Sequence, residues 1–377
     1  MVGAHTVMSQ SGVRTLVARA ERLVVKLGTA VLTGGSGELD RGVLHGVASE
    51  VRALREAGRD VLIVSSGAIG AGMGALGIGH RPRDVASLQA SAAVGQPLLM
   101  SLWREAFAAQ GLSVAQLLVG RDDFDARDRY LNIRNCVIRL HELGAVPILN
   151  ENDTVATQEL SLGDNDVLAA RLAVAVQAHA LIVLTTAPGV MDQSGAVVNE
   201  ARDAESLRPL VRTDRTAQGR GGMGTKVEAA RVAGLGGVAT VIASGRPPSN
   251  LGAVARGEPV GTFVAGPARR IGGRRSWIAL SATPMGRVTV DDGAARALVE
   301  RNASLLARGV TGCEGSFEAG DVVEVVGPGG ASLARGLVNF SSAELQRVVG
   351  RASEEFSAIL GRDAHEEVVH RDNLAVG

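Results

Sequence analysis

Short apolar runs alternate with longer amphipathic segments between residues 22 and 245. The runs have the length and β-branched content of buried strands, whereas the longer segments carry apolar residues at helical spacing. Because strands that alternate with helices form a parallel sheet with helices on both faces, this region predicts an α/β domain. Strands are expected at 22–27, 60–64, 113–119, 145–149, 180–184 and 238–243, and helices at 40–57, 88–110, 125–143, 166–176 and 222–233.

The pattern changes near Pro267, beyond which short strands and turns dominate. Strands are expected there at 286–290, 321–326 and 333–338, with helices at 292–301 and 342–349. This pattern predicts a small β-rich domain. The first residues are polar and lack the apolar core of a signal peptide. We therefore expect a tail over 1–20, an α/β domain over 21–268, a linker over 269–275 and the β-rich domain over 276–370.

The chain carries 39 basic and 39 acidic residues, and only 2% of its residues are aromatic. Neither value is typical of a protein that binds nucleic acid through a basic, aromatic-rich surface. Cys136 and Cys313 lie far apart and have no metal-ligand spacing, which suits a reducing cytoplasm. No apolar run is long enough to cross a membrane, so we expect a cytoplasmic protein that does not bind membranes.

Only two of the 39 basic residues are lysines, Lys26 and Lys226, and both lie among glycines. In a chain that uses arginine almost everywhere, these two positions are candidates for a role that arginine cannot fill. A compact ammonium beside exposed backbone amides suits a phosphate group. The alternative is that two lysines survived by chance.

Four stretches carry the candidate chemistry: VVKLGT (24–29), SSGAIGAG (65–72), NENDTV with GDND (150–155 and 163–166), and RGGMGTK (220–226). Small residues at a strand end or a helix start let backbone amides approach an anion. The acidic and amide cluster suits capture of an ammonium, orientation of the lysines, or Mg²⁺ held through water. The alternatives are a plain turn, tight helix–sheet packing, an Asx-rich capping loop and a surface loop.

Taken together and in this order, the stretches resemble the glutamate 5-kinase family of the amino acid kinase superfamily. The resemblance covers nearly the whole chain from about residue 21, and the second domain, which closes with VVHRDNL, is similar to a PUA domain. It implies a three-layer αβα sandwich with a mostly parallel sheet, followed by a small β-rich PUA-like domain. The implied reaction is ATP-dependent phosphorylation of the side-chain carboxylate of L-glutamate to L-glutamyl 5-phosphate, the first step of proline synthesis. The family also implies Mg²⁺, feedback inhibition by proline, and a homo-oligomer, either dimer or tetramer.

The resemblance also implies roles for individual residues. Lys26 and Lys226 act on the transferring phosphoryl group, and Asp166 orients their ammonium groups. No protein ligand to a metal is implied. The positions that match substrate binding are Ser66, Gly67, Asp153 and Asn165, and those that match nucleotide binding are Lys26, Gly28, Thr29, Thr185, Thr186, Arg220, Gly221, Gly222, Met223, Gly224, Thr225 and Lys226.

The residues also fit this chemistry on physical grounds. A side-chain carboxylate with a pKa near 4.3 is already ionised at neutral pH, so the reaction needs no general base. The barrier is repulsion between two anions, which lysines and Mg²⁺ offset. The scattered histidines, none of which lies in a nucleophile motif, agree with this.

The sequence departs from the family pattern in the nucleotide half. Thr186 stands where aspartate is usual, and Arg220 stands where threonine is usual. The effect on nucleotide affinity or preference stays open: Arg220 either clamps the triphosphate or is a solvated side chain. Other readings are a related kinase that acts on N-acetylglutamate or aspartate, RNA binding through the PUA-like domain, and a structural or regulatory role.

Overall fold

A computed structural model describes residues 11–33, 38–120, 122–155, 165–211, 222–266, 273–280, 283–362 and 364–376. The chain divides into two compact units. The first comprises Met1–Asp123 and Asp128–Arg270, and the second comprises Phe124–Arg127 and Ile271–Gly377. Within the second unit, Trp277 Nε1 donates a hydrogen bond of 3.0 Å to the Phe124 carbonyl.

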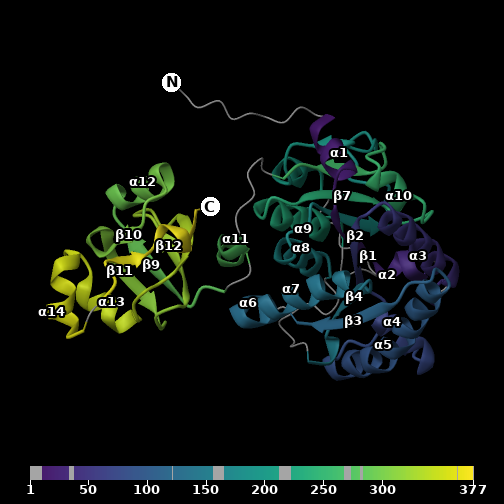
Figure 1. Cartoon of the computed structure of the whole chain (residues 1–377), viewed down its shortest axis with the longest axis horizontal. Helices are drawn as coiled ribbons and strands as arrows, with labels where there is room; N and C mark the ends of the chain where they lie inside the picture. The colour runs from purple at the N-terminus through teal and green to yellow at the C-terminus, as the bar shows by residue number, and fades with distance from the viewer. Residues whose placement is uncertain are drawn as a thin grey trace. The chain divides into compact units, whose positions relative to one another are not determined.

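The first unit is built on an eight-stranded sheet in the order β3-β4-β2-β1-β5-β7-β8-β6, formed by the described residues (Figure 1). Neighbouring strands are parallel except for the antiparallel pair β7 and β8. The chain starts in the middle of the sheet at β1, adds β2 beside it, and then forms the edge strand β3. Strand β4 lies between β3 and β2, and β5 continues the sheet on the other side of β1. The strands are β1 (Arg22–Leu27), β2 (Asp60–Ser65), β3 (Val114–Val119), β4 (Val146–Glu151), β5 (Ala180–Thr185), β6 (Glu200–Ala201), β7 (Ala239–Ser244) and β8 (Thr262–Val264).

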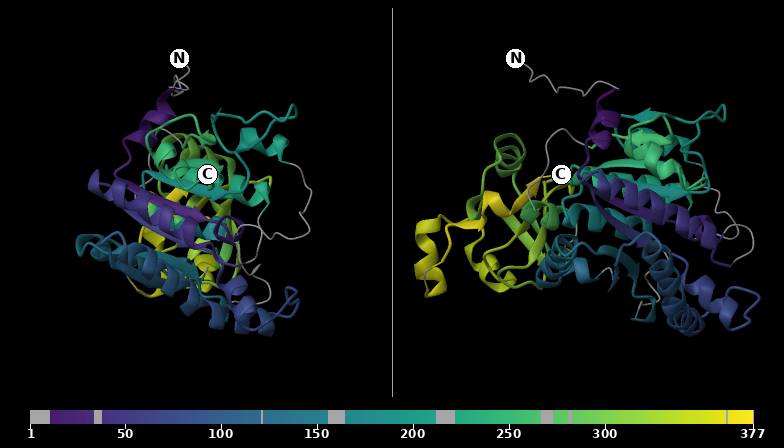
Figure 2. Two further views of the ribbon diagram at one scale, coloured as in Figure 1. Left: turned by 90° about the vertical axis from the view of Figure 1, so that its right-hand side faces the viewer. Right: turned by 45° about the vertical axis from the view of Figure 1, so that its right-hand side comes forward.

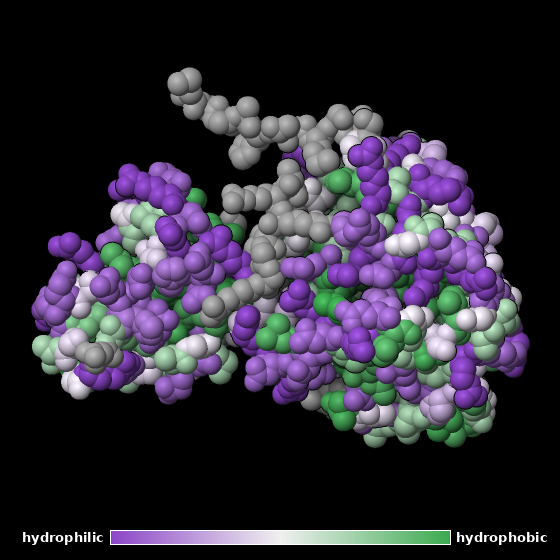
Figure 3. All heavy atoms as spheres, viewed as in Figure 1, coloured by the Kyte–Doolittle hydropathy of each residue, from purple (hydrophilic) through white to green (hydrophobic). Residues whose placement is uncertain are grey.

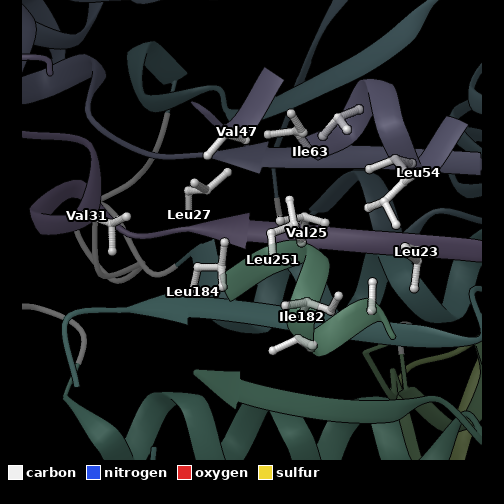
Figure 4. Packing of buried hydrophobic residues seen from close by; sticks show 14 of the residues in the cluster. Leu23, Val25, Leu27, Val31, Val47, Leu54, Ile63, Ile182, Leu184 and Leu251 are labelled. Carbon is white, nitrogen blue, oxygen red and sulfur yellow. The ribbon is translucent and has the colours of Figure 1, made fainter. Parts of the chain in front are cut away.

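Helices cover both faces of this sheet, which confirms the three-layer αβα architecture (Figures 1 and 2). On one face, alternate residues of β1, β2 and β5 pack against α3 and α10 in a dry core, and Figure 4 shows Leu23, Val25 and Leu27 of β1 within it. On the other face, α8 packs against β1 and α9 against β7. The helices are α1 (Ser11–Ala18), α2 (Thr29–Thr33), α3 (Arg41–Glu56), α4 (Ala68–Ala75), α5 (Val85–Ala108), α6 (Asp122–Asp125), α7 (Arg127–Glu142), α8 (Asn165–Ala175), α9 (Met223–Leu235) and α10 (Asn250–Ala255), with 3₁₀ turns η1 (Asp153–Val155) and η2 (Glu205–Leu210).

The expected N-terminal tail over 1–20 is wrong for its second half. Residues Ser11–Ala18 form α1, in which Val13 and Val17 are 4% and 0% exposed and join the core. These two valines lie four residues apart, so one face of a single helix buries both. The expected linker over 269–275 contains the boundary between the two units, after Arg270, and its last residues belong to helix α11 (Gly273–Leu280).

Helices α4 and α5 cross at two glycines, and this crossing shapes the edge of the site described below. A Cβ atom on Gly72 would lie 1.7 Å from the Ser91 carbonyl oxygen, and one on Gly95 would lie 1.8 Å from the Ala68 carbonyl oxygen. No side chain fits in either place. Tight packing therefore explains Gly72 of the SSGAIGAG stretch, whereas Gly67 has another role.

The second unit has its own core under a five-stranded sheet in the order β11-β9-β12-β13-β15. It extends beyond the expected end at residue 370, because β15 (Leu374–Val376) pairs with β13 (Ser332–Leu337). The remaining elements are β9 (Gly286–Val290), α12 (Asp292–Arg301), β10 (Leu305–Leu306), η3 (Ala307–Gly309), β11 (Val310–Gly315), β12 (Val322–Val326), α13 (Ser342–Val348), η4 (Ser353–Glu355), α14 (Phe356–Leu360), β14 (Glu367–Val369) and η5 (Arg371–Asn373).

Candidate active site

Both lysines of the chain meet at one buried carboxylate. Lys26 Nζ lies 2.6 Å from Asp166 Oδ1, and Lys226 Nζ lies 3.1 Å from Asp166 Oδ2. Each lysine is only 5% exposed and Asp166 only 1%. The three residues come from the end of β1 and from the first turns of α8 and α9, so the carboxyl edge of the central strands brings them together.

The charges of this cluster fix its protonation state. Burial alone would raise the pKa of Asp166, but the ammonium groups of Lys26 and Lys226 outweigh burial and lower the pKa to about 2. Thr225 Oγ1 donates a further hydrogen bond of 2.7 Å to Oδ2. A single carboxylate therefore holds two ammonium groups, which leaves a net positive charge in a water-poor edge of the sheet.

Backbone turns surround the two ammonium groups. The Gly28 amide donates to the Leu184 carbonyl over 3.2 Å, which ties the turn after β1 to β5, and Thr29 then opens α2. A Cβ atom at Gly28 would lie 3.7 Å from Lys26 Nζ, so glycine keeps this side of the ammonium open. Helix α9 begins at Met223 after Gly222, which has no side-chain cap. The first turn of α9 thus presents uncapped amides beside Lys226, an arrangement that attracts anions.

A second, uncharged cluster lies next to Asp166. Asn165 Nδ2 donates to the Ser65 carbonyl (3.0 Å), to Ser66 Oγ (3.1 Å) and to Asn150 Oδ1 (3.1 Å). Gly67 follows Ser66 with a φ of 109°, a left-handed conformation that favours glycine, and it forms the N-cap of α4. The cluster therefore joins the carboxyl ends of β2 and β4 to the start of α8.

Asp153 lies in η1, directly after β4, and is 7% exposed. Its Oδ1 atom is buried and has no hydrogen-bond partner among the described residues. Burial, and then the nearby carboxylate of Glu151, raise the pKa of Asp153 to about 7, against a smaller opposing effect from Arg81. A cationic ligand beside Oδ1 would stabilise the ionised carboxylate and give this oxygen the hydrogen-bond partner that it lacks among the described residues.

Comparisons with known proteins agree with this arrangement. Residues 21–244 match the amino acid kinase family, and residues 286–360 match the PUA domain. Glutamate 5-kinase from Thermus thermophilus is 44% identical over 362 residues, which cover 95% of this chain and 97% of that protein. Glutamate 5-kinases from Stutzerimonas stutzeri and Gloeobacter violaceus are 44% and 45% identical, over 96% and 93% of this chain and over 99% and 98% of those proteins. This chain belongs to the glutamate 5-kinase family.

Most site positions implied by the family resemblance lie along one edge of the sheet. Lys26, Asp166 and Lys226 are in direct contact, and Thr225 bonds the same carboxylate. Gly28, Thr29, Gly222, Met223 and Gly224 lie in the turns beside the lysines, and Ser66 contacts Asn165. Gly67 follows Ser66 at the N-cap of α4, and Asp153 adds a buried carboxyl group after β4.

Two implied nucleotide positions, Thr185 and Thr186, stand apart from this contact network. Thr185 closes β5 and is half-buried, whereas the Thr186 side chain is exposed. Arg220 and Gly221 lie outside the described residues. The structure of this glutamate 5-kinase family member therefore gives no contact that explains how Thr186 or Arg220 differs from the family pattern.

Sequence patterns did not single out Asn150 or Gln96, which the structure connects to the site. Asn150 Nδ2 donates to Gln96 Oε1 over 2.7 Å, and Asn150 Oδ1 accepts from Asn165. Asn150 lay within a recognised polar stretch, but nothing in the helical pattern of α5 marked Gln96.

Two absences concern the described part of the chain alone. It contains no group of three or more histidine, cysteine, aspartate or glutamate side chains arranged to hold a metal ion. None of its helices combines the length and apolar character needed to traverse a lipid bilayer. The face drawn in Figure 3 mixes hydrophilic and hydrophobic residues.

Proposed function

We propose that this protein transfers the γ-phosphoryl group of ATP to the side-chain carboxylate of L-glutamate, giving L-glutamyl 5-phosphate for proline synthesis. The observation that carries the proposal is the contact of Lys26 and Lys226 with one buried carboxylate, Asp166. Family membership supports the same reaction.

The reaction needs charge neutralisation more than proton transfer. A carboxylate oxygen of glutamate forms a bond to the γ-phosphorus while the bond from phosphorus to the β–γ bridging oxygen breaks, and ADP leaves. Glutamate is already ionised, so no base is required. The ammonium groups of Lys26 and Lys226 offset the negative charge of the approaching reactants, and Asp166 holds both ammonium groups in place.

The uncharged cluster and Asp153 suit the amino acid itself. In this proposal the reacting carboxylate faces Lys26 and Lys226, while the Asp153 carboxylate accepts the α-ammonium group. Ser66 and Asn165 contact the substrate beside the lysine cluster in this proposal, since Asn165 adjoins Asp166 in the chain and bonds Ser66. The Gly67 amide adds a backbone donor. These assignments rest on the geometry and on the resemblance of these positions to the family pattern.

ATP enters as its magnesium complex in this proposal. The described residues offer no carboxylate cluster for the metal, and Asp166 is already paired with two lysines. When bound, the ion would take oxygen ligands and would offset part of the negative charge of the phosphates. Proline inhibition and a dimeric or tetrameric assembly remain predictions from the family resemblance. Exposed apolar side chains at the C-cap of α4 and on α5, Leu76 and Leu98, support the assembly.

Purified protein is expected to convert glutamate to a hydroxamate when incubated with MgATP and hydroxylamine, which traps acyl phosphates. The hydroxamate should form from L-glutamate and not from L-aspartate or N-acetyl-L-glutamate. Of these three acids, only L-glutamate has both a free α-ammonium group and the longer side chain. Lys26→Met serves as the inactive control. Equal or faster hydroxamate formation from either of the other acids would refute the substrate assignment.

The KM for glutamate is expected to rise about tenfold between pH 8 and pH 6, whereas the KM for ATP changes little. The pKa of Asp153 is raised to about 7, so the proton that Asp153 takes up below this pH removes the charge that holds the α-ammonium group. Initial rates across this pH range test the expectation. Asp153→Asn should raise the KM for glutamate at every pH and remove the pH dependence.

Stability supplies an independent check on Asp153. Its pKa in the folded protein, about 7, exceeds the ordinary value of 3.8, so ionisation destabilises the fold as the pH rises through this interval. Asp153→Asn lacks this penalty and should melt at a higher temperature than the parent at pH 8, but not at pH 4. A KM for glutamate that stays constant with pH in the parent protein would contradict the assignment.

A further inference from the structure

Gln96, on α5, lies at the far end of a chain of side-chain amides that starts beside Asp166. Asn165 donates to Asn150 over 3.1 Å, and Asn150 donates to Gln96 over 2.7 Å. Helix α5 also packs against η1, which carries Asp153. The chain of amides thus leads from the lysine cluster toward the Asp153 end of the site.

Backbone groups at two points fix the orientation of every amide in this chain. Asn165 Nδ2 must face the Ser65 carbonyl, which can only accept, at 3.0 Å. Asn150 Oδ1 must face the Glu151 amide, which can only donate, at 3.0 Å. Asn150 therefore donates a hydrogen bond from Nδ2, and Gln96 must accept it through Oε1. A flip of any amide would set donor against donor or acceptor against acceptor.

With the amide orientations fixed in this way, three buried polar atoms near the site have no hydrogen-bond partner among the described residues. Gln96 Nε2 is a donor, and Asn165 Oδ1 and Asp153 Oδ1 are acceptors. Buried polar atoms without partners are uncommon, and at a binding site they indicate where ligand atoms belong. Two acceptors suit an ammonium group, whereas the donor suits a carboxylate oxygen.

We propose that Gln96 Nε2 donates a hydrogen bond to the α-carboxylate of the bound amino acid and so helps to select a free α-carboxylate. The inference rests on the proposed function, because the reacting carboxylate must face Lys26 and Lys226. The α-carboxylate then lies at the opposite end of the substrate, where the amide chain ends in Gln96. Asn150 is the positioning residue that turns Gln96 Nε2 toward the ligand.

The test compares L-glutamate with L-isoglutamine, its α-amide, which keeps the reacting side-chain carboxylate. Gln96→Glu preserves the size and the acceptor for Asn150 but replaces the donor with a negative acceptor. It should lower kcat/KM for glutamate by about tenfold or more, through KM, and leave the KM for ATP within about twofold. The introduced carboxylate repels the α-carboxylate and accepts from the α-amide, so the preference for glutamate over isoglutamine should shrink by about tenfold.

Two further variants serve as a control and as an alternative to Gln96→Glu. Gln177→Glu makes the same chemical change at an exposed residue ahead of β5 and should leave both substrates unaffected. Gln96→Met removes the donor without adding charge and should also raise the KM for glutamate, which keeps the test valid if the charged variant does not fold. An unchanged preference in both Gln96 variants, with a parent that phosphorylates glutamate, overturns the role of Gln96 alone. A parent that fails to phosphorylate glutamate overturns the proposed function instead.

Discussion

Asp166→Ala is expected to lower the free energy of unfolding by about 3–5 kcal/mol and to abolish measurable turnover. The substitution would leave the ammonium groups of Lys26 and Lys226, each 5% exposed, without the carboxylate that pairs with both. Removing one partner from a buried ion pair is far more damaging than replacing the whole group, because an uncompensated charge stays buried. Urea unfolding at neutral pH measures the change.

A matched variant separates stability from activity. Lys26→Met, Asp166→Leu and Lys226→Met combined remove all three charges and fill the space with apolar side chains, so most of the lost stability should return while activity stays absent. The pH dependence has a defined sign: the pKa of Asp166 is lowered from 3.8 to about 2, so its contribution is present above pH 4 and lost as the pH falls toward 2. If Asp166→Ala unfolds at the parental urea concentration, the cluster does not have the energetics inferred for it.

The α/β part of the fold could be predicted from the sequence because its elements have strong local signals. The expected strand over 22–27 is β1, and apolar residues at helical spacing in 40–57, among them Val43, Val47 and Val51, form the buried face of α3. Helix α1 was missed although Val13, Leu16 and Val17 stand at helical spacing, because the helix is only eight residues long and its burial depends on tertiary packing. The antiparallel pairing of β7 with β8 could not be predicted from the sequence either, because nothing in the three residues of β8 encodes the direction of the strand.

For the site as well, residues with a local sequence signal could be predicted, whereas residues that depend on long-range contacts could not. Two lysines in a chain otherwise rich in arginine could be recognised from composition, and their contact with Asp166 agrees with the roles expected of them. Gln96 could not be recognised, because it lies among exposed residues of α5 and acquires its meaning only through Asn150, 54 positions away. Sequence patterns identify residues that are unusual in themselves, whereas a common side chain becomes important through its partners.

Lys226→Arg is expected to lower kcat by about 100-fold or more, although the charge is preserved. Lys226 Nζ and Thr225 Oγ1 share one oxygen of Asp166, at 3.1 Å and 2.7 Å, while Lys26 occupies the other oxygen. A planar guanidinium is larger than an ammonium and would favour a two-pronged pairing with the carboxylate. It would therefore displace Thr225 or Lys26 and move the positive charge away from the transferring phosphoryl group.

Steady-state rates with saturating glutamate and MgATP measure this effect, and a swap in the opposite direction on the same helix controls for it. Arg231→Lys changes an α9 residue that pairs with Glu228 outside the site, and it should keep kcat within about twofold because exposed ion pairs contribute little. Lys226→Met should be at least as slow as Lys226→Arg, since it removes the charge as well as the shape. If Lys226→Arg keeps kcat close to that of Arg231→Lys, a diffuse positive charge is sufficient there, and the rarity of lysine in this chain has no catalytic meaning at residue 226.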